Sequence, residues 1–241
     1  PPTPGMVTTL TDDVWWVDLQ GTSAFLVDDD VLTLVDAGMP WHSSRLARAV
    51  DQVGSVGDIG RVIVTHFDID HVGGLGRLGG LDATVYVGVD DAPYLRGEER
   101  PPLGNRKGLL QRALDLTRAT PDLPVEPVTD GDTVGSFRAY HTPGHTPGHT
   151  AFVSEDRSLG LLGDLVVESD GRYELPPWYL NYDESRIRDS LVDFADRAGE
   201  FAVACQGHGT PFVDRGTDRV ADAARRAEEG GTGTDTTSTR A

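Results

Sequence analysis

The sequence contains one cysteine, one lysine and no long apolar run, and each shortage excludes a class of protein. Cys205 has no partner for a disulfide within the chain, which argues against a disulfide-rich secreted domain and favours a reducing compartment. No run of about 18 apolar residues occurs, so no membrane-spanning helix is expected. Residues 1–5 lack the basic and apolar segments of a signal peptide. We therefore expect a cytoplasmic protein without a membrane partner.

Basic side chains are also scarce. The 241 residues include 39 acidic residues against 21 Lys and Arg, which gives a net charge of -18, and Lys107 is the lone lysine. Nucleic-acid binding requires a basic face, so no nucleic-acid partner is expected. Regular apolar runs argue against disorder. The acidic, lysine-poor composition resembles that of salt-adapted proteins from extreme halophiles, in which high salt screens the self-repulsion.

Short apolar runs alternate with amphipathic segments along most of the chain. The runs predict strands at 14–17, 24–27, 31–35, 61–64, 84–87, 137–140, 151–154, 159–162 and 201–205. Helices are predicted from Ser43 or Ser44 to Val53, over 109–116, from Asp183 or Ser185 to Phe194, and over 215–229. This alternation predicts an α/β (α+β) fold with sheets covered by helices. We expect an N-terminal extension at 1–12, a single domain at 13–230 and a disordered tail at 231–241.

The densest group of reactive side chains lies in the segment Thr65–Gly74, which directly follows the predicted strand 61–64. Within six residues it contains two imidazoles and two carboxylates, those of His66, Asp68, Asp70 and His71. All four are competent metal ligands, and the Gly-Gly pair behind them permits a tight turn. We interpret this segment as one wall of a metal site.

Three further segments have the same form, in which an apolar strand ends on a ligand-type residue flanked by glycine. They are His141–His149, Leu161–Asp164 and Gly207–Gly209. Six of the seven histidines lie in these segments or in the first one. Glycine beside a ligand allows close approach of the backbone and avoids crowding around an ion. These segments are candidates for the other wall of the site.

The types, spacing and order of the four segments resemble those of the metallo-β-lactamase-fold hydrolases. In that family, loops at one edge of a four-layer αβ/βα sandwich carry H-x-H-x-D-H, a downstream His, a bridging Asp and a final His. The resemblance covers roughly residues 14–215 and includes Asp36-Ala37-Gly38 as the early Asp of the family. It implies a single-domain hydrolase with two divalent metal ions and a small-molecule substrate. A metal-bridging hydroxide would attack the carbonyl of an ester, thioester, lactone or amide.

The resemblance also implies a role for each ligand-type residue. The implied ligands form two sets that share one carboxylate: His66 and His145 for the first metal, Asp70, His71 and His208 for the second, and Asp164 for both. Asp70 would in addition be catalytic, because its counterpart in the family orients the hydroxide and passes on its proton. Zinc is the expected metal, with manganese or iron as alternatives.

Asp68 departs from the family pattern, which most often has His at this position. We expect Asp68 to bind the first metal directly in place of that His. The alternative is a carboxylate that only orients another ligand. A carboxylate ligand would make the site harder and more anionic, which favours manganese or iron more than imidazole does.

The remaining candidates have less direct predicted roles. We expect His141 and His149 to support the ligand between them, Asp36 to brace the metal loops, and Cys205 to pack as a small apolar residue. Substrate contacts are assigned to three side chains near the predicted mouth of the site: Tyr182, Tyr179 and His42.

The segment 90–120 holds the densest basic patch in this acidic chain. It is either a solvated connecting helix or a lid that brings cations near an anionic substrate. Two alternatives to the hydrolase of carbonyl compounds stay open: a phosphodiesterase or nuclease of the same fold, and a non-catalytic metal-binding member. The sequence also leaves the oligomeric state open, a homodimer included.

Overall fold

The N-terminal half of the chain forms the larger of two main sheets. The computed structural model describes residues 6–104, 106–114 and 122–231. The strands of this sheet lie in sequence order: β1 (Val7–Thr11), β2 (Val14–Asp18), β3 (Ser23–Asp28), β4 (Leu32–Val35), β5 (Ile59–Val64), β6 (Thr84–Gly88) and β7 (Val125–Val128). Pairing is antiparallel from β1 to β4 and parallel from β4 to β7. The carboxyl ends of β4, β5 and β6 therefore meet at one edge.

The C-terminal half forms the second sheet. Its strand order is β14 (Val203–Gln206), β11 (Leu159–Gly163), β10 (Thr150–Ser154), β9 (Phe137–His141) and β8 (Thr133–Val134). Strands β11 and β14 are parallel, so they too end at a common edge. A small hairpin of β12 (Val167–Ser169) and β13 (Arg172–Glu174) lies apart from both sheets in the pairing.

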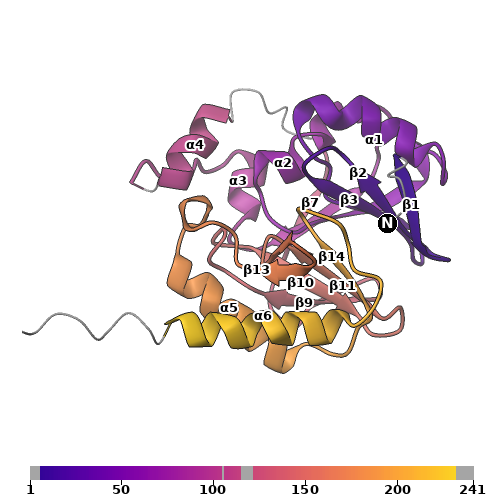
Figure 1. The fold of residues 1–241 in the computed structure, drawn as a ribbon. Helices are drawn as coiled ribbons and strands as arrows, with labels where there is room; N and C mark the ends of the chain where they lie inside the picture. The colour runs from indigo at the N-terminus through magenta and orange to yellow at the C-terminus, as the bar shows by residue number, and fades with distance from the viewer. Residues whose placement is uncertain (1–5, 105, 115–121, 232–241) are drawn as a thin grey trace, which may run out of the picture.

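Helices cover the outer faces of both sheets (Figure 1). On the first sheet lie α1 (Ser43–Val50), α2 (Ile69–Val72) and α3 (Ala92–Arg96), with α4 (Arg106–Leu114) beyond them. On the second lie α5 (Glu184–Arg197) and α6 (Gly216–Gly231). The short 3-10 helices are η1 (Pro40–His42), η2 (Val56–Asp58), η3 (Leu75–Arg77) and η5 (Trp178–Leu180).

The packing of β5 shows why its apolar run is buried on both sides. Successive side chains of a strand point to opposite faces of the sheet. Val62 and Val64 accordingly pack in the cluster that also contains Leu46 of α1, whereas Ile63 packs between the sheets with Phe137 of β9. A third apolar cluster joins the second sheet to α5 and α6. These three cores separate four layers and confirm the predicted α/β fold class.

Two strands of the larger sheet were not predicted. The described part of the expected N-terminal extension contributes β1, which pairs with β2, so the expected boundary at residue 13 falls inside the sheet. Strand β7 contains Glu126 and Pro127 and lies at the edge, where a missing N–H is tolerated. Apart from Gly231, the expected disordered tail lies outside the described residues, as do residues 115 and 116 of the helix predicted over 109–116. Among the described helices, none has the length and apolar character to cross a membrane.

Candidate metal centre

The candidate ligands gather where the strands of both sheets end. His66 follows β5, Asp164 follows β11 and His208 lies two residues beyond β14. The single turn of α2 carries Asp70 and His71. Backbone hydrogen bonds hold these loops together across the two sheets, since Thr150 N donates to the carbonyl of Thr65 at 2.9 Å. The two parallel strand groups thus bring together residues that are far apart in the sequence.

The ligand-type residues form three groups, in each of which the ligand atoms lie within 4.8 Å of one another, and these groups divide into two sets around Asp164. The first ligand set is His66, Asp68 and His145, and the second ligand set is Asp70, His71 and His208. Asp164 Oδ2 lies 3.2 Å from Nε2 of both His145 and His208, and Asp164 Oδ1 lies 3.5 Å from Nε2 of His71. The structure therefore brings all seven predicted ligand residues into one cluster.

The ring orientation of His71 and His66 is set by Asp36. Nδ1 of His71 lies 2.8 Å from the Asp36 carboxylate, which can only accept, so this nitrogen carries the proton. The Thr65 hydroxyl donates to Asp36 at 2.8 Å and accepts from Nδ1 of His66 at 3.0 Å. Asp36 also accepts from Thr65 N and adopts a left-handed φ of 54°, which Asp tolerates. In both rings Nε2 is consequently the nitrogen available to bind a metal ion, and it faces the cluster.

His145 and His208 are held in the same way. Nδ1 of His145 donates to Asn181 Oδ1 at 3.0 Å, and the amide orientation follows because Asn181 Nδ2 donates to the Pro176 carbonyl. Nδ1 of His208 donates to the Gly21 carbonyl at 2.6 Å. Each imidazole therefore has one nitrogen committed to the protein and the other turned toward the carboxylates, the arrangement typical of metal-binding histidines.

Several of the converging atoms lack a hydrogen-bond partner. His66 Nε2, His71 Nε2 and Asp164 Oδ1 are buried and find no hydrogen-bond partner among the described residues. Buried polar atoms without a partner cost free energy, and such atoms in native structures commonly mark a missing ion. These atoms and the four converging Nε2 atoms fit divalent metal ions, and the candidate residues are therefore able to hold them.

The electrostatics of the cluster favour the binding of positive charge. Asp164 raises the pKa of His208 to about 12. Burial opposes charging of His71, but Asp164 and Asp36 overcome it and raise its pKa to about 9. At His66 burial dominates, together with the nearby His71, and lowers the pKa to about 4. The carboxylates thus attract cations, and a metal ion would displace the protons of the second ligand set.

Helix α4 contributes two side chains that reach Asp68. Lys107 Nζ lies 2.7 Å from Asp68 Oδ2, and Gln111 donates to Asp68 Oδ1. Both side chains are buried. Burial disfavours the charge on Asp68, yet Lys107, His145 and His66 hold the pKa of this carboxyl well below its usual range. The described part of the basic segment 90–120 is therefore more than a solvated connection, since it packs onto the ligands.

Asp91 is a central residue that the sequence analysis did not single out. Its carboxylate accepts from the Phe67 amide at 3.1 Å, the Thr146 hydroxyl at 2.7 Å and the Gly148 amide at 2.7 Å. It thereby ties the His66 loop to the loop that carries His145. Burial raises its pKa to about 7 although these hydrogen bonds oppose the shift. An acid just after β6 gives the same signal as Asp36 after β4, and this signal could have identified it.

His149 holds the backbone of Asp164 in place. Its Nε2 accepts from the Asp164 amide at 3.0 Å while its Nδ1 lies 2.8 Å from the Thr142 hydroxyl. Burial holds the pKa of His149 well below its usual value, so the ring is neutral. His141 lies further out, with Nε2 3.1 Å from the Pro147 carbonyl. Both histidines hold the backbone that presents the ligands.

The three side chains predicted to contact substrate lie in different surroundings. Tyr182 is half-buried, and its hydroxyl donates to Gln111 Oε1, next to Asp68. Tyr179 is exposed, and its ring packs edge-on against that of Trp178. His42 accepts from the Met39 amide. Burial lowers the pKa of His42, and the negative charge of Asp70 opposes this shift. Of the three, Tyr182 is thus connected to the ligand cluster through hydrogen bonds.

Gly207 lies against two ligands and leaves no room for a side chain. A Cβ at this position would overlap Asp164 Oδ1 and lie 2.6 Å from His71 Cε1. We expect Gly207→Ala to displace these ligands and to weaken metal binding at least about tenfold, measured by titration against a chromophoric chelator. Gly79→Ala is the matched control, because an added Cβ there meets nothing within 4 Å. Equal affinity of Gly207→Ala and the wild type would contradict the packing argument.

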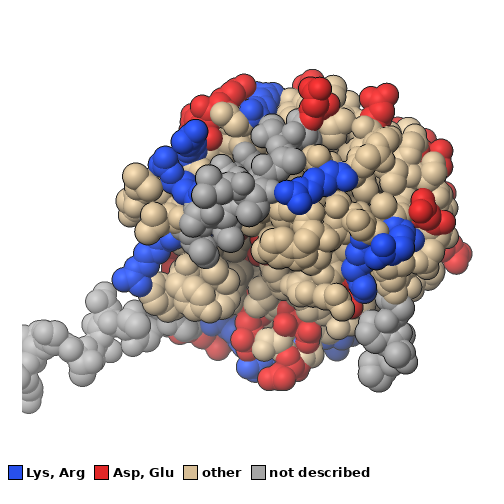
Figure 2. Space-filling view, turned by 90° about the horizontal axis from the view of Figure 1, so that it is seen from above, with Lys and Arg blue, Asp and Glu red and all other residues tan. Residues whose placement is uncertain are grey.

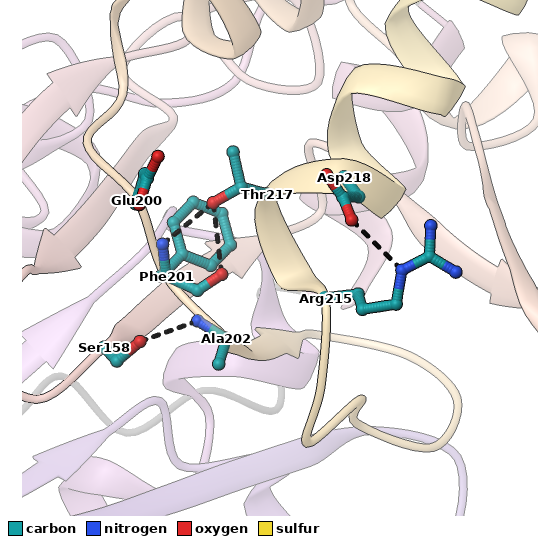
Figure 3. Close-up of a pocket in the computed structure, with 7 residues that line it drawn as sticks. All are labelled: Ser158, Glu200, Phe201, Ala202, Arg215, Thr217 and Asp218. Carbon is teal, nitrogen blue, oxygen red and sulfur yellow. Dashed lines mark hydrogen bonds and ion pairs between the residues drawn. The ribbon is translucent and has the colours of Figure 1, made fainter.

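A separate cavity of about 330 Å³ is lined by the residues in Figure 3. Ser158 and Ala202 directly precede β11 and β14, so the cavity lies at the opposite edge of the sheet from Asp164 and His208. Most of its polar groups bond to one another, with Ala202 N donating to Ser158 Oγ and Arg215 paired with Asp218. We assign this cavity to packing of the loops around α6.

Comparison with known proteins gives a family and several similar proteins. The family profile of the Metallo-beta-lactamase superfamily matches residues 16–208. The Uncharacterized protein YobT of Bacillus subtilis (strain 168) is 26% identical over 223 residues, which are 86% of this chain and 91% of that protein. A structure of TTHA1623 in a di-iron-bound form is 30% identical, covers 80% of this chain and 90% of the other, and has a TM-score of 0.60. BJP-1, a subclass B3 metallo-beta-lactamase of Bradyrhizobium japonicum, is 21% identical with a TM-score of 0.66 and covers 95% of this chain and 93% of its own.

Proposed function

The chain belongs to the metallo-beta-lactamase superfamily, and from this premise we propose that it is a dinuclear metal-dependent hydrolase. The proposed substrates are small molecules with an ester, thioester, lactone or amide bond. The observation that carries the proposal is the convergence of four histidine Nε2 atoms on Asp68, Asp70 and Asp164, while every Nδ1 is held by an acceptor or a hydroxyl. Such a donor set suits two divalent ions that share a carboxylate.

The protein supplies position and proton transfer. His66, Asp68 and His145 would hold one ion and the second ligand set the other, with Asp164 between them. Two such ions supply an activated water near neutral pH and polarise a carbonyl oxygen. Asp70 lies at the half-buried rim, 3.4 Å from His208 Nε2, where its carboxylate would orient the attacking water and accept its proton. The His rings stay fixed because their Nδ1 atoms are tied to the fold.

Zinc is the proposed metal, with manganese or iron as alternatives. Imidazole nitrogen suits zinc, whereas the three carboxylates move the donor set toward harder ions. The di-iron-bound form of TTHA1623, which is 30% identical to this chain, supports iron as an alternative. Metal analysis of the protein after expression in media supplemented with zinc, manganese or iron would distinguish the three metals.

A small-molecule substrate is favoured over a nucleic acid. The net charge of -18 repels phosphate backbones. On the described part of the face in Figure 2, basic side chains are scattered among neutral and acidic ones and form no continuous surface. We also propose that Tyr182, Tyr179 and His42 contact the substrate. For Tyr182 this is supported by its link to Asp68 through Gln111.

The proposal is tested with the metal-free protein reloaded with zinc, manganese or iron at molar salt, which screens its charge. Each form is offered lactones, thioesters, amides, β-lactams and phosphodiesters, and the metal-free protein is the control. We expect cleavage of at least one carbonyl substrate that depends on the added metal. Cleavage of phosphodiesters alone would favour a nuclease. Two tightly bound ions without turnover of any substrate would favour a non-catalytic metal-binding protein.

A further inference from the structure

The lone lysine of the chain is buried beside the first ligand set. Lys107 is 4% exposed and lies in the first turn of α4. Burying an ammonium group is costly unless it is paired and hydrogen-bonded. In a chain whose other basic residues are all arginine, a buried lysine at this place calls for a specific partner.

The partner is the oxygen through which Asp68 faces the histidines. Lys107 Nζ lies 2.7 Å from Asp68 Oδ2 and donates to the His145 carbonyl at 2.9 Å. The same Oδ2 lies 3.4 Å from His66 Nε2 and 3.2 Å from His145 Nε2. A metal ion bound by the first ligand set would therefore share this oxygen with the ammonium group.

Gln111 keeps Asp68 in place independently of Lys107. It lies one helical turn further along α4, donates to Asp68 Oδ1 and accepts from the Tyr182 hydroxyl. The carboxylate is thus oriented by an amide through one oxygen and neutralised by an ammonium group through the other. Removal of the lysine charge alone should leave the orientation of Asp68 largely intact.

The second ligand set has no comparable cation. Among the ion pairs of the described residues, Asp70 pairs with His208, and Asp164 pairs with four histidines. Once a metal ion has displaced the protons of these histidines, both carboxylates keep their full negative charge for it, whereas the charge of Asp68 stays offset by Lys107. The two ligand sets therefore differ in net charge although they have equal numbers of residues.

We infer that Lys107 makes the first ligand set the weaker of two unequal metal sites, because its ammonium group repels the ion and competes for Asp68 Oδ2. The inference rests on the proposed metal centre. The second ligand set, together with Asp164, binds an ion first and tightly. The first set binds its ion in a later, exchangeable step.

The test is a stepwise zinc titration of the metal-free protein in competition with a chromophoric chelator. We expect two binding steps for the wild type, separated by at least about tenfold in Kd. Lys107→Met keeps an unbranched side chain of similar length and removes its charge, and it should tighten the weaker step at least about tenfold. Arg112→Met is the matched control, since it removes one charge from the same helix and should leave both steps unchanged.

Asp68→Asn shows which binding step belongs to the first ligand set, and it should weaken the later step alone. Lys107→Gln is the second lysine variant, used if Lys107→Met does not fold, which is checked by its unfolding transition. Lys107→Gln in the otherwise wild-type protein should tighten the later step as Lys107→Met does. Two wild-type steps with equal Kd would overturn the inference. So would a weaker step whose Kd is unchanged or higher in both Lys107→Met and Lys107→Gln. A folded wild type that binds no zinc, manganese or iron would instead refute the proposed metal centre.

Discussion

Asp164→Ala is expected to reduce kcat/KM on the order of 10³-fold, about 4 kcal/mol of transition-state stabilisation, and to lower the metal content from two ions per chain to one or none. Asp164 is the carboxylate common to both ligand sets. Its oxygens lie 3.2 to 3.5 Å from Nε2 of His71, His145 and His208. Without it, two cations would face each other with no shared anion to offset their repulsion.

The measurement pairs metal analysis of the purified protein with kinetics on the best substrate of the panel. Asp189→Ala on α5 is the control, because it removes an exposed carboxylate of the same kind. Circular dichroism separates a lost site from a lost fold. An Asp164→Ala protein that retains two ions and wild-type turnover would show that the cluster is not the catalytic centre.

Asp91→Ala is expected to destabilise the protein by about 3 kcal/mol, because buried donors without a partner cost about 1–3 kcal/mol each. The substitution leaves three such donors: the Phe67 and Gly148 amides and the Thr146 hydroxyl. The effects are not additive, since the loops relax together. Both loops carry ligands of the first set, so metal binding should weaken as well.

Urea unfolding of the metal-free protein at molar salt measures this loss without a contribution from metal. Asp90→Ala is the neighbouring control, because the Asp90 side chain is 58% exposed and belongs to the same loop. We expect it to change stability by less than about 0.5 kcal/mol. A small effect of Asp91→Ala, similar to that of Asp90→Ala, would mean that the loops are held by other contacts.

Most of the strands and the types of the candidate ligands are visible in the sequence. Strand β5 reads as an apolar run because both of its faces are buried, and the run stops at Val64, two residues before His66. The amphipathic pattern of α5 follows from one face that packs on the second sheet, with Asp183 accepting from Arg186 N at its start. These features are local, because burial on a strand or helix imposes a period on its own residues.

The edges of the sheet and the supports of the ligands were decided by tertiary structure. Strand β7 holds its place through pairing with β6 although Pro127 argues against a strand by itself. Asn181 orients His145 across 36 residues, and Lys107 reaches the same loop across 38. No sequence periodicity connects residues so far apart, because their contact depends on the packing of distant segments.

Asp68 shows both sides of this division. The sequence by itself determined that a carboxylate stands at a ligand position beside His66, Asp70 and His71. Only the folded chain decided that the lone lysine would lie 2.7 Å from that carboxylate, because α2, β6 and α3 separate α4 from it along the chain and the two meet through packing. Spacing along the chain thus identified the candidate ligands, whereas the charge around each of them was determined by contacts between distant segments.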